Sequence, residues 1–188
     1  MKNPLYYALA GTALCISLVA VLTAQKGQSS VSANATGKAL AASETHTGPI
    51  AWQAFDQGLA SAQSEKKLIM VEFFATWCGY CRKMDEETFV DSKVQQALNQ
   101  YFVPVRVTES SDNPVEYQGK QVTEKELTAL HGVTGYPTIM FMTASGELIT
   151  KVPGYQPPGE FQQMLEYIGS ESYKSMDFQA FRDARKQG

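Results

Sequence analysis

Hydrophobic residues are spaced along the chain in two ways, some in short unbroken runs and some at helical intervals. Residues 68–75 form an apolar run interrupted only by Glu72, which predicts a central strand covered on both faces. Residues 102–107 predict a parallel neighbour, and residues 137–143 and 147–152 predict two strands joined by a hairpin turn. Helices are expected over residues 50–64, 79–87, 92–100, 123–132 and 161–168, with a short amphipathic helix around Phe178 and Phe181. Strands that alternate with helices indicate an α/β fold.

Two segments need separate interpretation. Trp52, Phe55 and Leu59 fall at helical spacing within residues 50–64, and an aromatic stripe of this kind usually packs in a core. The polar segment 109–121 is long for a connection, and long loops are often functional. It contains no chemically distinctive residue, so we expect a surface loop there.

The length and charge of the chain limit its organisation. Its 188 residues provide one globular domain and an appendage, and a net charge of -3 gives no sign of a nucleic-acid partner. Residues 5–24 are almost uninterruptedly apolar, so residues 1–24 are either a cleaved signal peptide or a retained membrane anchor. Either alternative exports the rest of the chain. Residues 25–48 hold scarcely any large apolar residue and predict a flexible linker, which leaves residues 49–188 as the domain.

A pair of cysteines directly follows the central strand, in Trp77-Cys78-Gly79-Tyr80-Cys81. A helix is predicted to begin there, and its unpaired backbone N–H groups and dipole stabilise a thiolate on Cys78. Two intervening residues let the second sulfur fold back on the first, so Cys81 can resolve a mixed disulfide formed by Cys78. The spacing therefore predicts thiol–disulfide exchange with Cys78 as the nucleophile, and the redox-active pair itself requires no cofactor.

Metal binding is the main competing use of two cysteines at this spacing. A tetrahedral zinc site needs four ligands, and beside the pair the exported part offers only His131 and, in the linker, His46. The third cysteine, Cys15, lies within the N-terminal apolar segment. We therefore expect no metal site.

The sequence Gly135-Tyr136-Pro137-Thr138, about sixty residues after the cysteines, makes the pattern more specific. Together with the Trp-Cys motif it resembles thioredoxin, which implies a central mixed sheet flanked by helices. By that resemblance Pro137 is cis and faces the cysteine pair. Tyr136 offers backbone groups to the substrate, and Trp77 is suited to binding a partner protein.

Glu72 matches the position of a buried acidic residue in the thioredoxin strand motif. The resemblance implies that Glu72 relays a proton to and from Cys81. Burial would help, because it keeps a carboxyl group protonated to higher pH. The alternative is a carboxylate at the strand end that reaches water or pairs with a neighbour such as Lys67.

A closer likeness, over about residues 50 to 170, is to exported bacterial thioredoxin-like proteins of the SoxW-like type and to the C-terminal domain of the transmembrane reductase DsbD. It rests on the charged segment from Lys83 to Asp91 and on the turn Pro153-Gly154-Tyr155. The Cys-Gly-Tyr-Cys tetrad resembles instead the periplasmic disulfide isomerase DsbC. Tyr80 replaces the proline between the cysteines of thioredoxin and leaves the direction of catalysis open.

These resemblances imply a thiol-disulfide oxidoreductase of the cell envelope that reduces disulfides in exported proteins. It would act in the periplasm or at the periplasmic face of the inner membrane, with a DsbD-type membrane protein as electron donor. Two alternatives remain open: a periplasmic isomerase or oxidase, and a non-enzymatic factor that binds or assembles thiol proteins through Trp77, Tyr136 and Pro137.

Overall fold

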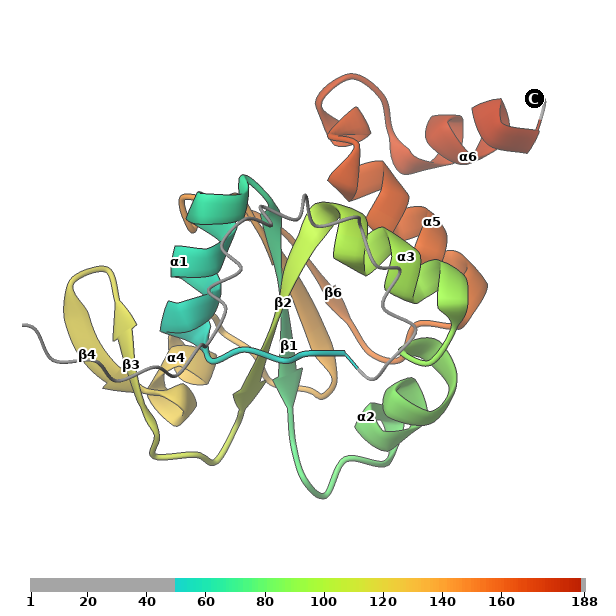
Figure 1. Cartoon of the computed structure of the whole chain (residues 1–188). Coiled ribbons are helices and arrows are strands. Elements are labelled where there is room, and N and C mark those ends of the chain that lie inside the picture. The colour runs from blue at the N-terminus through green and yellow to red at the C-terminus, as the bar shows by residue number, and fades with distance from the viewer. Residues whose placement is uncertain (1–49, 187–188) are drawn as a thin grey trace, which may run out of the picture. The chain divides into compact units, whose positions relative to one another are not determined.

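The computed structural model describes residues 50–186, which fold around one mixed sheet between two layers of helices (Figure 1). The expected signal peptide or anchor at 1–24 and the linker at 25–48 lie outside the described residues. Within residues 50–186, no helix combines the length and the apolar character needed to cross a membrane.

The sheet has the strand order β2-β1-β5-β6. Strand β1 (Leu68–Phe74) is parallel to β2 (Phe102–Thr108) and antiparallel to β5 (Thr138–Met142), and β5 pairs in turn with β6 (Leu148–Pro153). The apolar run in β1 predicted a strand inside the sheet, because both faces of such a strand are covered and neither needs polar side chains. The predicted mixed sheet is confirmed.

Two hydrophobic clusters cover the faces of the sheet. One face is covered by α1 (Phe55–Glu65) and α4 (Glu124–Leu130). The other is covered by α3 (Ser92–Tyr101), α5 (Pro158–Gly169) and the π-helical turn η1 (Met84–Thr88), which continues α2 (Gly79–Lys83). Side chains alternate along β1, so Val71 and Phe73 enter the first cluster and Met70 the second. By the same alternation Glu72 lies on the face of Met70, beneath the helices that follow the cysteines.

The prediction of a helix from residue 50 was wrong at its start. Helix α1 begins at Phe55, and Gln53 instead adds a bridge to the outer edge of β2. The N–H of Gln53 donates to the Pro104 carbonyl at 3.0 Å. Trp52 therefore does not share a helical face with Phe55. It packs against Phe89 in the opposite cluster, with ring centroids 5.1 Å apart.

The polar segment expected to be a loop contains most of a β-hairpin. Strands β3 (Pro114–Tyr117) and β4 (Lys120–Thr123) pair with each other and lead into α4 (Figure 1). Val115 is buried and Tyr117 packs edge-on against Phe55, which attaches the hairpin to the α1 side of the sheet. The predicted capping box is present, with Thr123 and Glu126 exchanging side-chain-to-backbone hydrogen bonds at the start of α4.

The predicted C-terminal helix is also present. After α5, a short 3-10 turn η2 (Ser172–Lys174) leads into α6 (Phe178–Lys186). The ring of Phe181 packs against Tyr167 of α5 at 5.3 Å between centroids, and Arg185 forms an ion pair with Glu166.

Candidate redox site

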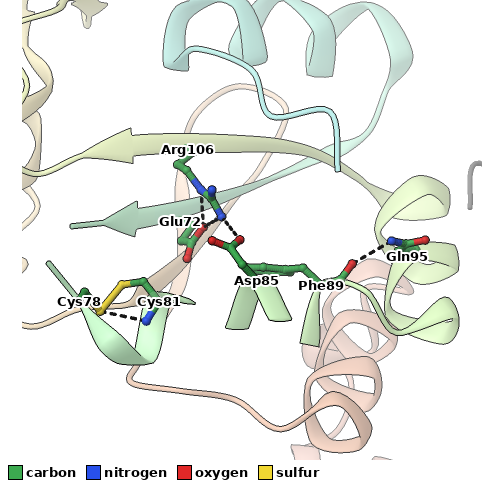
Figure 2. Close-up of polar contacts among 7 residues, drawn as sticks. All are labelled: Glu72, Cys78, Cys81, Asp85, Phe89, Gln95 and Arg106. Carbon is green, nitrogen blue, oxygen red and sulfur yellow. Dashed lines mark hydrogen bonds and ion pairs between the residues drawn. A yellow bond between two sulfur atoms is a disulfide. The ribbon is translucent and has the colours of Figure 1, made fainter. Parts of the chain in front are cut away.

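The two cysteines lie at the point where β1 leads into α2. Cys78 is the N-cap of α2, and its sulfur accepts a hydrogen bond from the backbone N–H of Cys81 at 3.0 Å. The two residues form a disulfide with their Cα atoms 5.3 Å apart (Figure 2). A sulfur at an N-cap lies against backbone N–H groups that favour negative charge. The arrangement therefore supports a thiolate on Cys78 once the disulfide is reduced.

The two cysteines differ in their exposure to solvent. Cys78 keeps 4% of its surface exposed and Cys81 none. Both pack with Ala75 in a small cluster against which Phe74 and Tyr136 lie. A partner sulfur can approach Cys78 more easily than Cys81, which is the order expected of a nucleophile and a resolving cysteine.

The proline loop packs against the same cluster, and its Tyr136–Pro137 peptide bond is cis, as expected from the sequence. In the part of the chain that the structure describes, the backbone N–H and C=O of Tyr136 form no hydrogen bond. The next carbonyl along, that of Pro137, accepts from the N–H of Gly154 at 2.8 Å. The backbone groups of Tyr136 are therefore free to bind an extended peptide, as the sequence resemblance predicted, and that role stays a prediction.

Trp77 projects from the surface beside the cysteines, with 68% of its area exposed. Its ring meets Tyr136 edge-on at 5.8 Å between centroids, and its Nε1 donates to Glu109 Oε1 at 2.9 Å. Burial, together with the charge of Glu109, raises the pKa of Tyr136. The expected grouping of Trp77, Tyr136 and Pro137 around the cysteines is thus present, although their binding role stays a prediction.

Glu72 is completely buried, and within residues 50–186 Arg106 is the one charged side chain that pairs with it. The Nε of Arg106 donates to Glu72 Oε2 at 2.7 Å, and its Nη2 reaches Asp85 Oδ1 at 2.5 Å. Figure 2 shows the second oxygen of Glu72 on the side that faces the disulfide. That oxygen, Oε1, is buried without a hydrogen-bond partner among the described residues.

Opposing effects set the charge of Glu72. Burial raises its pKa, the charge and hydrogen bond of Arg106 lower it, and Asp85 raises it slightly, with the result that the pKa lies at about 7. Burial therefore outweighs the ion pair. A carboxyl group with this pKa can both hold and release a proton near neutral pH, as a proton relay requires.

Arg106 and Asp85 were not predicted to belong to the site, and the neighbour suggested for Glu72 in the alternative interpretation was Lys67. Lys67 pairs with Glu65 at 2.8 Å instead. Arg106 lies directly opposite Glu72 in the parallel pairing of β1 and β2. Its guanidinium lies 4.2 Å from the centroid of the Trp52 ring, which explains why Trp52 belongs on this face. A register for the two predicted strands would have suggested this pair.

No metal site is apparent in the described part of the chain. Residues 50–186 contain no group of three or more His, Cys, Asp or Glu side chains placed to hold a metal ion. His131 lies at the end of α4, where its ring contacts Phe73 and Tyr117, rather than beside the cysteines.

Comparisons with known proteins agree with this geometry. A family model described as "Thioredoxin-like domain" matches residues 55–169. Among curated proteins, the chain is 29% identical over 119 residues to the thiol:disulfide interchange protein DsbD of Photorhabdus laumondii, covering 62% of this chain and 19% of that protein. It is 32% identical over 115 residues to DsbD of Tatumella citrea, covering 58% and 18%. A protein disulfide-isomerase of Ricinus communis is 28% identical over 109 residues, covering 58% and 19%. The chain thus matches less than a fifth of the length of these relatives.

Solved structures show the same fold. A thioredoxin-fold protein from Helicobacter pylori has a TM-score of 0.55 at 22% identity, covering 65% of this chain and 86% of that one. A thioredoxin from Thermus thermophilus has a TM-score of 0.52 at 26% identity, covering 64% and 87%. The fold and the Cys78–Cys81 disulfide define a thiol-disulfide oxidoreductase of the thioredoxin class. The chain belongs to the thioredoxin-like domain family.

Proposed function

We propose that the protein reduces disulfides in exported client proteins. In the reduced form the Cys78 thiolate attacks a client disulfide, forms a mixed disulfide with one client sulfur and releases the other as a thiolate. Cys81 then loses its proton and attacks the sulfur of Cys78. The client leaves as a dithiol after gaining two electrons and two protons, and the Cys78–Cys81 disulfide is formed. The observation that carries the proposal is this disulfide, seated at the start of α2 against the loop of Pro137.

Glu72 would accept the proton that Cys81 loses. Its partnerless oxygen lies on the side of the disulfide, and its pKa of about 7 lets it ionise near neutral pH. Arg106 holds the other oxygen and so orients the carboxyl group. Asp85, bonded to the same guanidinium, is partly exposed and connects the group with the surface.

The cellular setting is also part of the proposal. The N-terminal apolar segment would export the domain, as a signal peptide or an anchor, to the periplasm or the periplasmic face of the inner membrane. Disulfides persist in that compartment, so a reductase there must be recharged by an external dithiol. The similarity to DsbD proteins supports a DsbD-type membrane donor.

The decisive experiment separates attack from resolution. We expect Cys81→Ala protein, expressed in cells, to accumulate mixed disulfides with clients through Cys78, because no second thiolate resolves them. Cys78→Ala is the matched control and should trap few or none. Clients identified by mass spectrometry should be exported proteins. Complexes formed mainly by Cys78→Ala would reverse the roles of nucleophile and resolving cysteine. If the variant without both thiols restored the phenotype of cells lacking the protein, a binding or assembly factor would be favoured.

A disulfide isomerase or oxidase is the second candidate, supported by the similarity to the Ricinus communis protein disulfide-isomerase. The reduction potential of the Cys78–Cys81 pair distinguishes the two directions. Reductases of this fold lie near -270 mV and isomerases and oxidases at roughly -180 to -120 mV. Equilibration with glutathione buffers, read by thiol alkylation, therefore tests which direction applies.

A further inference from the structure

A second pair of aromatic rings, besides that of Trp77 and Tyr136, includes the residue between the two cysteines. Tyr80, between the two cysteines, has 63% of its area exposed, and its ring lies 6.4 Å from that of Tyr155, with the planes tilted by 33°. Tyr155 comes from the turn that follows β6, far from the cysteines in sequence. The ring of Tyr155 packs partly against the hydrophobic core, whereas the ring of Tyr80 is exposed beside a reactive sulfur, where it is available for binding.

The turn that carries Tyr155 is attached to both halves of the redox site. The N–H of Gly154 donates to the carbonyl of Pro137 at 2.8 Å, which joins the turn to the proline loop. The Tyr155 hydroxyl donates to Glu87 at 2.6 Å, and Thr88 donates to the Gln156 carbonyl at 2.7 Å. Glu87 and Thr88 belong to the helical segment that follows Cys81, so these two hydrogen bonds join the turn to that segment. The ring of Tyr155 is therefore fixed relative to the disulfide.

The charged side chains beside the two aromatic pairs differ. Beside Trp77 and Tyr136, Glu109 accepts from Trp77 and forms no ion pair within residues 50–186. Beside Tyr80 and Tyr155, Lys83 lies 4.5 Å from the centroid of the Tyr155 ring and 3.9 Å from the Glu87 carboxylate that Tyr155 binds. The charges of Lys83 and Glu87 offset each other there. The surface of Tyr80 and Tyr155 is thus aromatic and locally neutral, and the Tyr155 ring in it is held in place by its hydrogen bond to Glu87.

We propose that Tyr80 and Tyr155 form a specificity surface for clients, which selects an aromatic or large aliphatic side chain next to the reactive client cysteine. This inference rests on the proposed function, because it concerns the segment that Cys78 attacks. The client would lie across the site with its backbone at Tyr136, one neighbour of its cysteine near Trp77 and the other on the tyrosine pair. Aromatic rings provide a large contact area with few rotatable bonds, so they bind side chains at little entropic cost.

The test compares two peptides that differ only beside the cysteine. Each peptide carries one cysteine in a disulfide with a small thiol, flanked on both sides by Phe in one peptide and by Ser in the other. Reduction is driven by dithiothreitol, and kcat and KM are measured for each peptide. We expect the protein to prefer the Phe peptide by roughly tenfold in kcat/KM, mainly through KM, as one aromatic contact allows.

Substitutions of the two tyrosines test whether they cause the preference for the Phe peptide. Tyr155→Ala and Tyr80→Ala should each reduce the preference to about threefold or less, whereas Tyr155→Phe, which keeps the ring, should retain most of it. Tyr80 is largely exposed, so its replacement does not threaten the fold. Tyr173→Ala removes a half-buried tyrosine from η2 and is the matched control, for which the preference should not change.

Two outcomes overturn the inference. An unchanged preference in both Ala variants would show that the tyrosines do not contact the client. An equal slowing of both peptides would show that they only support the disulfide. A wild-type protein that reduces neither peptide contradicts the proposed function instead, so the two failures are distinguishable.

Discussion

Glu72 is the residue on which the chemistry of the site depends most after the cysteines. It lies in the centre of the sheet, where Arg106 donates a hydrogen bond to one of its oxygens. An ion pair alone would keep the carboxyl group charged, but the loss of hydration on burial is larger, and the pKa settles at about 7. The group is therefore able to change its charge at the pH of the cell, which an exposed glutamate does not do.

The raised pKa of Glu72 makes the stability of the protein depend on pH. Between the ordinary value of 4.5 and about 7 the unfolded state ionises Glu72 while the folded state keeps its proton. The folded state binds more protons in that window, so its free energy of unfolding falls as pH rises. The difference corresponds to about 3 kcal/mol. Relative to Glu72→Gln, the wild-type protein should lose this amount between pH 4.5 and pH 8 in urea denaturation.

Arg106→Met provides the control for this measurement. The arginine lowers the pKa of folded Glu72, so its removal should extend the upper end of the window to higher pH, while the lower end, set by the unfolded state, stays in place. A wild-type protein and a Gln variant whose stabilities differ by the same amount at every pH would show that the carboxyl group titrates normally and cannot relay protons near pH 7.

The same substitution has a kinetic consequence. Glu72→Gln keeps the shape of the side chain but cannot accept a proton, so the attack of Cys81 on the mixed disulfide should slow by roughly a hundredfold, the lower end of general-base catalysis. Alkylation of Cys78 in the reduced protein should change little. Stopped-flow measurement of mixed-disulfide collapse across pH tests this. An unchanged rate profile would leave Glu72 as a packing residue.

At the scale of secondary-structure elements, apolar runs predicted the four strands of the main sheet and helical spacing predicted most helices. The failures have physical causes. Residues 50–54 matched a helical pattern because Trp52 and Phe55 are three apart. Gln53 instead pairs with the edge of β2, and Trp52 packs on the face of the sheet opposite Phe55. The β3–β4 hairpin was not predicted because its strands hold only Val115, Tyr117 and Val122 as large apolar residues, too weak a pattern to indicate strands.

The contact between α1 and β2 depends on a glycine. A Cβ on Gly58 would lie 2.1 Å from Cγ2 of Val105, a strand residue with no exposed surface, so one of the two elements must shift. Alanine favours a helix by about 1 kcal/mol over glycine, but we expect Gly58→Ala to destabilise the protein by roughly 1–3 kcal/mol because overpacking displaces the helix. Urea denaturation measures this directly.

Gly159 in α5 is the matched control for Gly58. A Cβ there meets no atom within 4 Å, so Gly159→Ala should be neutral or slightly stabilising. If Gly58→Ala were also neutral, α1 would be less closely packed on β2 than the structure shows.

At the scale of the whole domain, the site assembles from segments that are far apart in sequence. The cysteines, Trp77 and the Tyr136-Pro137 loop could be predicted because each carries a local motif that a known family shares. Arg106, Asp85 and Tyr155 could not, since their relation to the cysteines depends on strand register and on where a turn packs. Local pattern therefore predicts the reacting groups, whereas tertiary packing determines the groups that orient them.

The C-terminal helix α6 lies beyond residues 55–169, the part that the family model matches. Phe178 and Phe181 both pack on Tyr167 at the end of α5, and Phe181, which is 8% exposed, is the buried residue of α6. We expect Phe181→Ala to lower the free energy of unfolding by about 2 kcal/mol, the value of one largely buried aromatic side chain. The ion pair between the half-exposed Arg185 and the largely buried Glu166 is a second attachment of α6 to α5.

The same variant shows whether this extension influences the redox site. Figure 1 places α6 at the opposite end of the domain from α2, the helix that begins at the cysteines. Effects of distant sites on stability are usually independent, so Phe181→Ala should leave the alkylation rate of reduced Cys78 unchanged. Gln179→Ala, on the exposed side of α6, is the control and should change neither the free energy of unfolding nor the alkylation rate. A faster alkylation in Phe181→Ala at a temperature where the domain stays folded would mean that α6 constrains the site through α5, and the extension would then be part of the redox machinery.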